Sequence, residues 1–386
     1  MSVSAPRTFR PCLRLAALAA TFLFLLAAPA AALETIAKQA ILMDAETSTV
    51  LLEKNADEAM PPSSMSKLMT VYLVFERLKS GSLTLDDKLP VSKKAWRKGG
   101  SKMYVLVGKS VSVEDLLRGI IVQSGNDATI VVAEGLSGTE EAFAIEMTKK
   151  GQEIGLENSV FTNASGWPEE GHYMTARDIA ILSKRTIDDF PDYYHYYAET
   201  SFTFSGIRQG NRNPLIYRNI GADGLKTGHT AAGGYGLAAS VERNGRRLIL
   251  VVNGLESAQS RANESQRLIE WGFREFANFA LFRAGDTVDE ANVWLGTEAK
   301  VPLIVEEDLV LTLPKRARRT AKVKVVYTGP IPAPITDGAE IAKLVITAPG
   351  LDDLVVPLKA GAEVRRLGFL GRISAAIQYL LWGGRR

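Results

Sequence analysis

The stretch from Pro61 to Thr70 constrains this 386-residue chain more than any other part of its sequence. It reads Pro-Pro-Ser-Ser-Met-Ser-Lys-Leu-Met-Thr, and the residues that follow, up to Phe75, continue a run that is apolar on nearly all sides. The two prolines predict an extended approach, and the apolar run predicts a helix buried inside a domain rather than lying on its surface. We expect Ser63 or Ser64 to cap the first turn of this helix.

Ser64 and Lys67 lie three residues apart, which places both on the same face of a helix. A buried lysine amine loses its charge readily, and a neutral amine can take a proton from a serine hydroxyl. The pair therefore fits a serine nucleophile with a lysine as general base. A helix cap beside a solvated lysine is the alternative, because Ser-x-x-Lys alone occurs in many proteins.

Residues 1–32 predict a secretory signal peptide. Three arginines precede an apolar run from Leu15 to Ala28, and Ala30-Ala31-Ala32 offers a small-residue cleavage site. An uncleaved membrane anchor is the alternative, and both predict an exported protein. The only cysteine, Cys12, lies inside this segment. The mature chain then has neither disulfides nor thiol chemistry nor cysteine metal sites.

The mature chain carries almost no net charge. Loss of the three leader arginines leaves 43 basic residues against 43 acidic ones. Such a balance gives no general attraction to nucleic acid, so we expect no nucleic-acid partner, and any basic surface must be local. The histidines show no metal-ligand spacing, and we expect no metal and no cofactor. His172 and His195 stand in polar or Tyr-rich stretches and are expected at the surface.

Residues 33–283 predict one domain with a sheet and a helical layer. Strand-like runs predict hairpins at both ends, around residues 45–47 and 243–245, and Asn-Gly at the second is a strong hairpin signal. Between them, three helices are expected to start at the capping residues Ser112, Thr139 and Thr175. A last helix is expected from about Gln259 to Phe282.

The rest of the chain has a different pattern. Residues 284–362 hold strand-like runs separated by Pro, Gly and Asp, which predicts a small all-β domain. Residues 363–386 predict an amphipathic helix, with apolar residues at helical spacing from Phe369 to Trp382, flanking arginines and no acid after Glu363. Such a helix fits a membrane interface with anionic headgroups. A helix docked onto the protein itself is the alternative.

Two further motifs accompany the Ser64 helix. Ser124-Gly125-Asn126 stands in a break between helical runs, where both polar side chains can point into a cleft. Lys226-Thr227-Gly228 directly precedes a strand-like segment. Each motif is common by itself, but the three in this order, on helix, loop and strand, form a specific signal.

With these motifs the chain resembles the low-molecular-mass penicillin-binding proteins, and among them the serine-type D-Ala-D-Ala carboxypeptidases. The resemblance covers essentially the whole mature chain. It implies an α/β (α+β) domain of the serine β-lactamase and transpeptidase type, with an antiparallel sheet and a helical subdomain, followed by a small all-β domain and a C-terminal amphipathic helix.

The resemblance also implies an activity and a location. The enzyme would be a hydrolase that removes the terminal D-alanine from the pentapeptide stems of peptidoglycan, and β-lactams would trap it covalently. It would be periplasmic and bound peripherally to the outer face of the inner membrane through its last helix. A D,D-endopeptidase or weak β-lactamase on the same fold, and a non-catalytic wall-binding or morphogenesis protein, are the alternatives.

The resemblance assigns the chemical steps to five residues. Ser64 would attack the peptide carbonyl, with Lys67 as general base. The backbone N–H groups of Ser64 and His229 would form the oxyanion hole. Ser124 and Lys226 would relay a proton to the leaving D-alanine.

Substrate binding is expected from a second group. Asn126 would hold the substrate amide and orient Lys67, and Thr227 would bind the terminal carboxylate, with Gly228 beside it in the motif. Arg261 resembles the family's further carboxylate ligand, because a guanidinium meets a carboxylate in a fork. An ordinary exposed helix arginine is the alternative for Arg261.

The loop 161–167 departs from the family pattern. Some members carry a histidine where Ser165 stands, and class A β-lactamases keep in this loop a glutamate that activates water. Glu157, Glu169 and Glu170 are nearby, but none fits that pattern. The sequence therefore favours a slowly deacylating peptidase over a β-lactamase.

Overall fold

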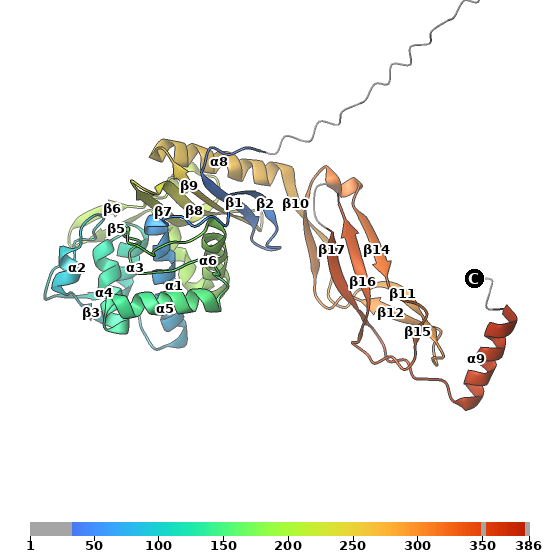
Figure 1. Cartoon of the computed structure of the whole chain (residues 1–386). Helices are drawn as coiled ribbons and strands as arrows, with labels where there is room; N and C mark the ends of the chain where they lie inside the picture. The colour runs from blue at the N-terminus through green and yellow to red at the C-terminus, as the bar shows by residue number, and fades with distance from the viewer. Residues whose placement is uncertain (1–32, 349–352, 383–386) are drawn as a thin grey trace, which may run out of the picture. The chain divides into compact units, whose positions relative to one another are not determined.

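The structure, a computed structural model, describes residues 33–348 and 353–382 (Figure 1). The predicted signal peptide, with Cys12 and its cleavage site, lies outside the described residues, as do Arg385 and Arg386. Thr35 to the end of the described chain forms one compact unit by its contacts.

A five-stranded antiparallel sheet, in the order β2-β1-β9-β8-β7, forms the centre of the first region. Its strands are β1 (Gln39–Asp44), β2 (Val50–Lys54), β7 (Ala222–Thr230), β8 (Gly234–Arg243) and β9 (Arg246–Leu255). Both predicted hairpins are confirmed. Asn244 and Gly245 have φ angles of 52° and 77°, as a tight two-residue hairpin turn requires.

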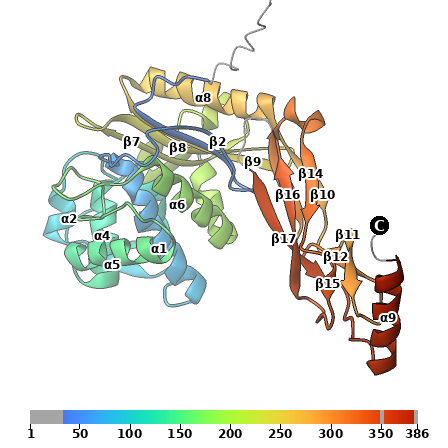
Figure 2. The same ribbon diagram turned by 45° about the vertical axis from the view of Figure 1, so that its right-hand side comes forward.

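Helices cover both faces of this sheet (Figure 2). Helix α8 (Ala258–Glu275) lies on one face, and α6 (Ala176–Asp189) lies on the other. The helical layer on the α6 side also contains α1 (Lys67–Ser80), α3 (Val113–Ile121), α4 (Asn126–Ser137) and α5 (Glu140–Glu153). The predicted caps Ser112, Thr139 and Thr175 are confirmed, since each side chain accepts a hydrogen bond from the backbone three residues later.

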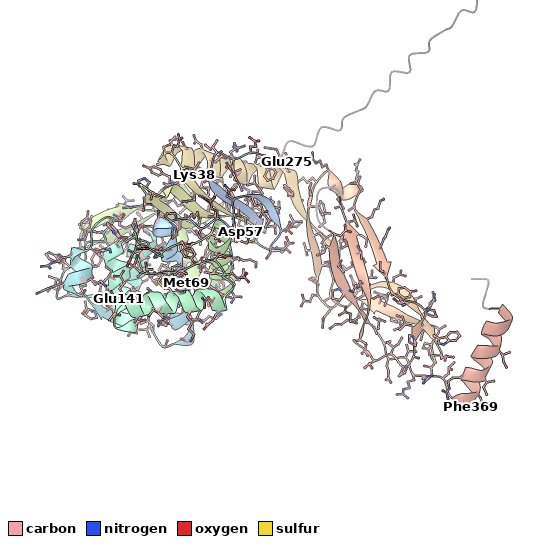
Figure 3. The ribbon with its side chains drawn as sticks, viewed as in Figure 1. Lys38, Asp57, Met69, Glu141, Glu275 and Phe369 are labelled. Carbon is pink, nitrogen blue, oxygen red and sulfur yellow. The ribbon has the colours of Figure 1, made fainter. Side chains whose placement is uncertain are left out.

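Helix α1 is buried within this layer, as predicted. Every residue from Lys67 to Phe75 is at most 3% exposed, and Met69 lies in the interior of the region (Figure 3). The expected cap is wrong. A 3-10 turn, η1 (Ser63–Ser66), precedes α1, and neither Ser63 nor Ser64 caps it. Within the turn, the Ser66 hydroxyl donates instead to the carbonyl of Ser63 at 3.2 Å.

Smaller elements fill the connections. They are the strands β3 (Lys88–Pro90), β4 (Ser110–Ser112), β5 (Ser201–Phe204) and β6 (Ile207–Gly210), and the short helices α2 (Lys93–Arg97), α7 (Pro191–Tyr194), η2 (His195–Ala198) and η3 (Ile216–Arg218). The two loops that matter most for the site follow α2 and α5.

The predicted extent of the last helix of this region is wrong. Helix α8 ends at Glu275, and residues 276–282 form the strand β10 (Phe276–Phe282), paired antiparallel with β13 (Leu309–Pro314). Phe279 and Phe282 pack against the core of the following β-rich region. Tertiary pairing thus overrides a local pattern that also suits a helix.

The β-rich region has its own core, which includes Val301, Leu303, Leu344 and Leu358. A six-stranded sheet has the order β14-β16-β17-β12-β11-β15. Its strands are β11 (Thr287–Trp294), β12 (Lys300–Ile304), β14 (Lys322–Val326), β15 (Ile331–Pro332), β16 (Glu340–Thr347) and β17 (Leu354–Ala360), with a short 3-10 turn η4 (Ala317–Arg319) before β14. The fold class is confirmed, while the exact domain boundaries stay a prediction.

The chain continues into helix α9 (Phe369–Trp382), which begins at the Phe369 labelled in Figure 3. Among the side chains of α9 that the structure describes, the large apolar ones of Phe369, Leu370, Ile373 and Ile377 are exposed. In the described part of the chain, no helix combines the length and the apolar character needed to cross a bilayer.

Candidate active site

Ser64 and Lys67 meet at the junction of η1 and α1. The Lys67 amine is 0% exposed. Its Nζ lies 2.8 Å from Ser64 Oγ, 2.7 Å from Asn126 Oδ1 and 2.5 Å from the carbonyl oxygen of Ser165. The 3-10 turn brings the two motif residues together, as a regular helical spacing would.

These three partners suit a neutral amine. Asn126 Oδ1 and the Ser165 carbonyl can only accept, whereas the Ser64 hydroxyl can also donate. A neutral Lys67 can therefore donate its two protons to the first two groups and accept the proton of Ser64 on its lone pair. Burial, together with the positive charges of Arg212 and Lys98, lowers the pKa of Lys67 to about 7, against the opposing effect of Asp127.

The Ser165 carbonyl was not foreseen as part of the site. A tight loop, in which Gly166 has a φ of 75°, orients this carbonyl toward Lys67. A Cβ on Gly166 would lie 1.8 Å from the Ser63 carbonyl oxygen, so only glycine fits there. Asn163 Oδ1 accepts hydrogen bonds from the backbone N–H groups of Ser165 and Trp167 at 3.1 and 3.0 Å. A backbone carbonyl cannot be predicted from the type of its own side chain. Gly166 could still have indicated a tight turn at this point of the loop.

Ser124 and Asn126 come from the break between α3 and α4. Ser124 is buried with a φ of 65°, and Asn126 begins α4. Besides binding Lys67, Asn126 donates through Nδ2 to the carbonyl of Gly99 at 2.9 Å. Asp127, next along the helix, accepts the backbone N–H groups of three residues, Met103, Tyr104 and Val105. The loop after α2 is thereby fixed beside the motif.

Lys226, Thr227 and Gly228 lie on β7, facing η1. Lys226 is 2% exposed, and burial, followed by the charges of Lys67, Arg212 and Arg261, lowers its pKa well below the usual range. A Cβ on Gly228 would lie 3.0 Å from the Pro62 carbonyl oxygen, so the glycine lets the strand and the turn approach closely. The two lysines therefore share one buried site.

His229 follows on the same strand with an exposed side chain, which stacks on Tyr235 at 3.9 Å between ring centroids. Tyr235 also lies 5.7 Å from the guanidinium carbon of Arg261. Arg261 is only 9% exposed, and its Nε has no hydrogen-bond partner among the described residues. The alternative interpretation of Arg261, as an ordinary exposed arginine on a helix, is therefore wrong.

Arg212 is a further cation at the site that no motif indicated. Its Nη1 donates to Ser101 Oγ at 2.6 Å, and its charge acts on Lys67, Lys226 and Arg261. It lies in an irregular segment, so nothing in the local sequence marks it. The site thus concentrates positive charge, which favours an anionic group on the ligand.

A cleft of about 340 Å³ opens at Ser64. Its other lining residues are Gly100, Ser101, Asn126, Ser165, Gly166, Trp167, Pro168, His229, Thr230 and Ala231. No carboxylate belongs to this lining. Among the described residues no group of three or more metal-ligating side chains comes together.

The expectation for His172 is wrong. Its ring is 7% exposed, and Nδ1 accepts the backbone N–H of Thr162 at 3.1 Å. Burial lowers the pKa of His172 to about 4, so it stays neutral and supports the loop that carries Ser165. The polar sequence around it concealed this role. His195 is exposed, as expected.

Comparison with known families gives two matches that together span most of the chain. The family model for D-alanyl-D-alanine carboxypeptidases matches residues 26–257. The model for the C-terminal domain of penicillin-binding protein 5 matches residues 276–366.

Individual relatives agree with these matches. The D-alanyl-D-alanine carboxypeptidase DacC of Escherichia coli is 38% identical over 376 residues, covering 94% of each chain. DacA of Haemophilus influenzae is 37% identical over 339 residues, covering 86% of each.

Solved structures show the same likeness. Penicillin-binding protein 5 from Haemophilus influenzae matches with a TM-score of 0.79 and 36% identity, over 86% of this chain and 99% of that one. Penicillin-binding protein D2 from Listeria monocytogenes, in its ampicillin-bound form, matches with a TM-score of 0.58 and 32% identity, over 62% of this chain and 98% of that one.

Proposed function

The chain belongs to the D-alanyl-D-alanine carboxypeptidase family, and we propose that it removes the terminal D-alanine from peptidoglycan pentapeptide stems with Ser64 as its nucleophile. One observation carries this proposal. The buried Lys67 amine lies 2.8 Å from Ser64 Oγ and has a pKa of about 7. It can therefore be a base near neutral pH.

In the first step, Ser64 Oγ attacks the carbonyl carbon of the penultimate D-alanine while Lys67 takes the hydroxyl proton. The backbone N–H groups of Ser64 and His229 stabilise the oxygen of the tetrahedral intermediate. The C–N bond then breaks, and Ser124 and Lys226 pass a proton to the departing amine. The products are free D-alanine and an ester on Ser64.

The terminal carboxylate sets the orientation of the substrate. Thr227, beside Gly228 on β7, binds this carboxylate, and Arg261 supplies a charged partner whose Nε has no hydrogen-bond partner in the part of the chain that the structure describes. Arg212 adds positive charge from the irregular segment that follows β6. A carboxypeptidase needs such a site, because it must distinguish a chain end from an internal residue.

In the second step, water hydrolyses the ester. No carboxylate lines the described cleft, so none of the described lining residues can act as the water-activating glutamate of class A β-lactamases. Lys67 is then the base for both steps. A β-lactam, which resembles the substrate terminus, is expected to acylate Ser64, and the resulting ester is expected to hydrolyse slowly.

The test uses a crosslinked and an uncrosslinked muropeptide, each with a pentapeptide stem, followed by product masses. We expect loss of one D-alanine from the uncrosslinked stem. Cleavage of the crosslink instead would assign an endopeptidase, and the absence of any mass change would contradict both enzymatic functions.

We also propose that the protein is exported to the periplasm and binds the outer face of the inner membrane through α9. The exposed apolar side chains Phe369, Leu370, Ile373 and Ile377 fall on one stripe of the helix, which suits an interfacial position. A chain cut after Gly368 should stay in the supernatant with anionic vesicles, whereas the full mature chain sediments with them. Equal sedimentation of both would contradict the anchor.

A further inference from the structure

Trp167 is an aromatic wall of the cleft that holds Ser64. Its side chain is 43% exposed, yet its backbone is clamped on both sides by one buried residue. Asn163 Oδ1 accepts the Trp167 N–H at 3.0 Å, and Asn163 Nδ2 donates to the Trp167 carbonyl at 3.0 Å. The backbone that carries the ring is thus held in place, since it cannot shift without breaking both bonds.

The ring also reaches the opposite loop. A Cβ on Gly100 would lie 3.0 Å from the Trp167 ring and 2.8 Å from Asn126 Nδ2, and Gly100 has a φ of 77°. Glycine is therefore needed where the ring, Asn126 and this loop meet. Trp167 thus lines the cleft beside Gly100 and Asn126.

Lys98 adds a charge to this wall. Its Nζ lies 4.9 Å from the centroid of the Trp167 ring, in a cation–π arrangement. The ammonium makes no ion pair or hydrogen bond with any residue that the structure describes. Its charge nevertheless reaches the site, because it helps to lower the pKa of Lys67. Two acids follow Trp167, and one of them, Glu169, accepts a hydrogen bond from Asn163 Nδ2.

We propose that Trp167 and Lys98 form a subsite for an acidic side chain on the acyl side of the scissile bond. This inference rests on the proposed function, in which the leaving D-alanine carboxylate is held at β7 and Arg261. The acyl part of the stem must then extend toward the opposite wall. The residue before the D-Ala-D-Ala pair is a diamino acid, and its aliphatic chain lies on the Trp167 ring while a terminal carboxylate meets Lys98.

The test compares D-alanine release from three pentapeptides that differ only at this residue. They carry meso-diaminopimelate, the same residue with its side-chain carboxylate amidated, or L-lysine. The side-chain ammonium is common to all three, so its contacts cancel in the ratio of kcat/KM values. We expect the free carboxylate to be preferred more than about twofold and up to about fivefold, the upper end of what one partly exposed ion pair contributes.

Variants then test whether the preference for the free carboxylate depends on Lys98. Lys98→Met should bring the ratio close to one, and Lys98→Arg should restore most of it. Lys93→Met is the matched control, because Lys93 is exposed at the start of α2, the helix that ends directly before Lys98, and it should keep the wild-type ratio. Trp167→Ala should reduce the rate with all three peptides, because it removes the surface for the aliphatic chain.

A wild-type ratio within about twofold of one, or a preference retained by Lys98→Met, would overturn the subsite. Both outcomes would leave the proposed function intact, since D-alanine is still released. Release from none of the three peptides would instead overturn the proposed function, and the subsite with it.

Discussion

At the scale of single residues, the site depends on keeping one amine uncharged. The folded protein binds the Lys67 proton with a pKa of about 7, against the ordinary lysine pKa of 10.5. Each pKa unit corresponds to about 1.4 kcal/mol, so the protonated amine destabilises the fold by roughly 5 kcal/mol. As pH rises from 7 to 10.5 the unfolded chain binds more protons than the folded one, and this penalty is relieved.

The same pKa predicts how acylation depends on pH. Only the neutral amine can accept the Ser64 proton, so the rate constant for acylation by a penicillin should fall about tenfold per pH unit below 7 and level off above it. Arg212→Gln should move the midpoint upward, because the Arg212 charge lowers this pKa. The matched control Arg208→Gln, at an exposed position on β6, should leave the midpoint in place. A flat profile from pH 5 to 9 in the wild type would be incompatible with Lys67 as the base.

The sequence alone predicts which motif residues come together in the fold. Ser64, Lys67, Asn126 and Lys226 all lie at one site, because the motif order matches helix, loop and strand. Arg212 and the Ser165 carbonyl could not be predicted in this way. Arg212 reaches the site from an irregular segment, and a carbonyl is positioned by the loop around it rather than by its own side chain.

At the scale of secondary-structure elements, the loop 161–167 supports the site as much as α1 does. It carries the Ser165 carbonyl that binds Lys67. The loop is held by hydrogen bonds from its own backbone N–H groups to Asn163, inside the loop, and to His172, which follows it in sequence. His172 was expected at the surface because its neighbours in sequence are polar. The burial of His172 depends on how the loop folds, and the composition of the neighbouring sequence does not predict it.

Gly166 gives a sharp test of this loop. In Gly166→Ala, the new Cβ would meet the Ser63 carbonyl oxygen at 1.8 Å and force the loop away from η1. We expect a loss of at least about 3 kcal/mol in the free energy of unfolding, from overpacking plus the left-handed φ. Because the Ser165 carbonyl moves as well, acylation should slow by about tenfold or more.

Gly171→Ala is the matched control for that variant. Gly171 also has a positive φ, of 80°, but its Cβ would meet only Thr162 Cγ2 at an ordinary 3.7 Å. It should therefore lose only about 1 kcal/mol and acylate normally. Urea unfolding and penicillin labelling of the two proteins measure both effects, and equal losses would show that the contact with Ser63 is unimportant.

Helix and strand signals were least separable where α8 gives way to β10. The sequence predicts one amphipathic helix from about Gln259 to Phe282, which includes the segment 276–282. Pairing with β13 satisfies its backbone instead, and β13 lies more than 25 residues later in the sequence. Local periodicity contains no information about such a distant partner.

At the scale of the whole molecule, the chain combines a reactive site, a β-rich region and a C-terminal helix. The β-rich region continues past Gly361, since Val364 is buried in its core and forms a bridge with Ile335. Leu367 donates its backbone N–H to the carbonyl of Leu295 at 2.9 Å. Removal of α9 must therefore spare these residues.

Two truncations test where this region ends. A chain cut after Gly368 should unfold at the same temperature as the full mature chain, because its β-rich core is intact. A chain cut after Gly361 loses Val364 and should lose about 2 kcal/mol or more in the stability of that region. Calorimetry measures the unfolding temperatures of both truncated proteins. Identical temperatures would show that residues 362–368 add nothing to the stability of the core.

The central claim is that Ser64 forms a covalent acyl-enzyme on the way to releasing D-alanine. Mass spectrometry of the intact protein after incubation with a penicillin tests it most directly, with peptide mapping of the adduct and a parallel assay of D-alanine release from a pentapeptide. We expect one adduct per chain, located on Ser64, and neither adduct nor D-alanine release in Ser64→Ala, which should still unfold cooperatively. An adduct on another residue, or D-alanine release by Ser64→Ala at the wild-type rate, would contradict it.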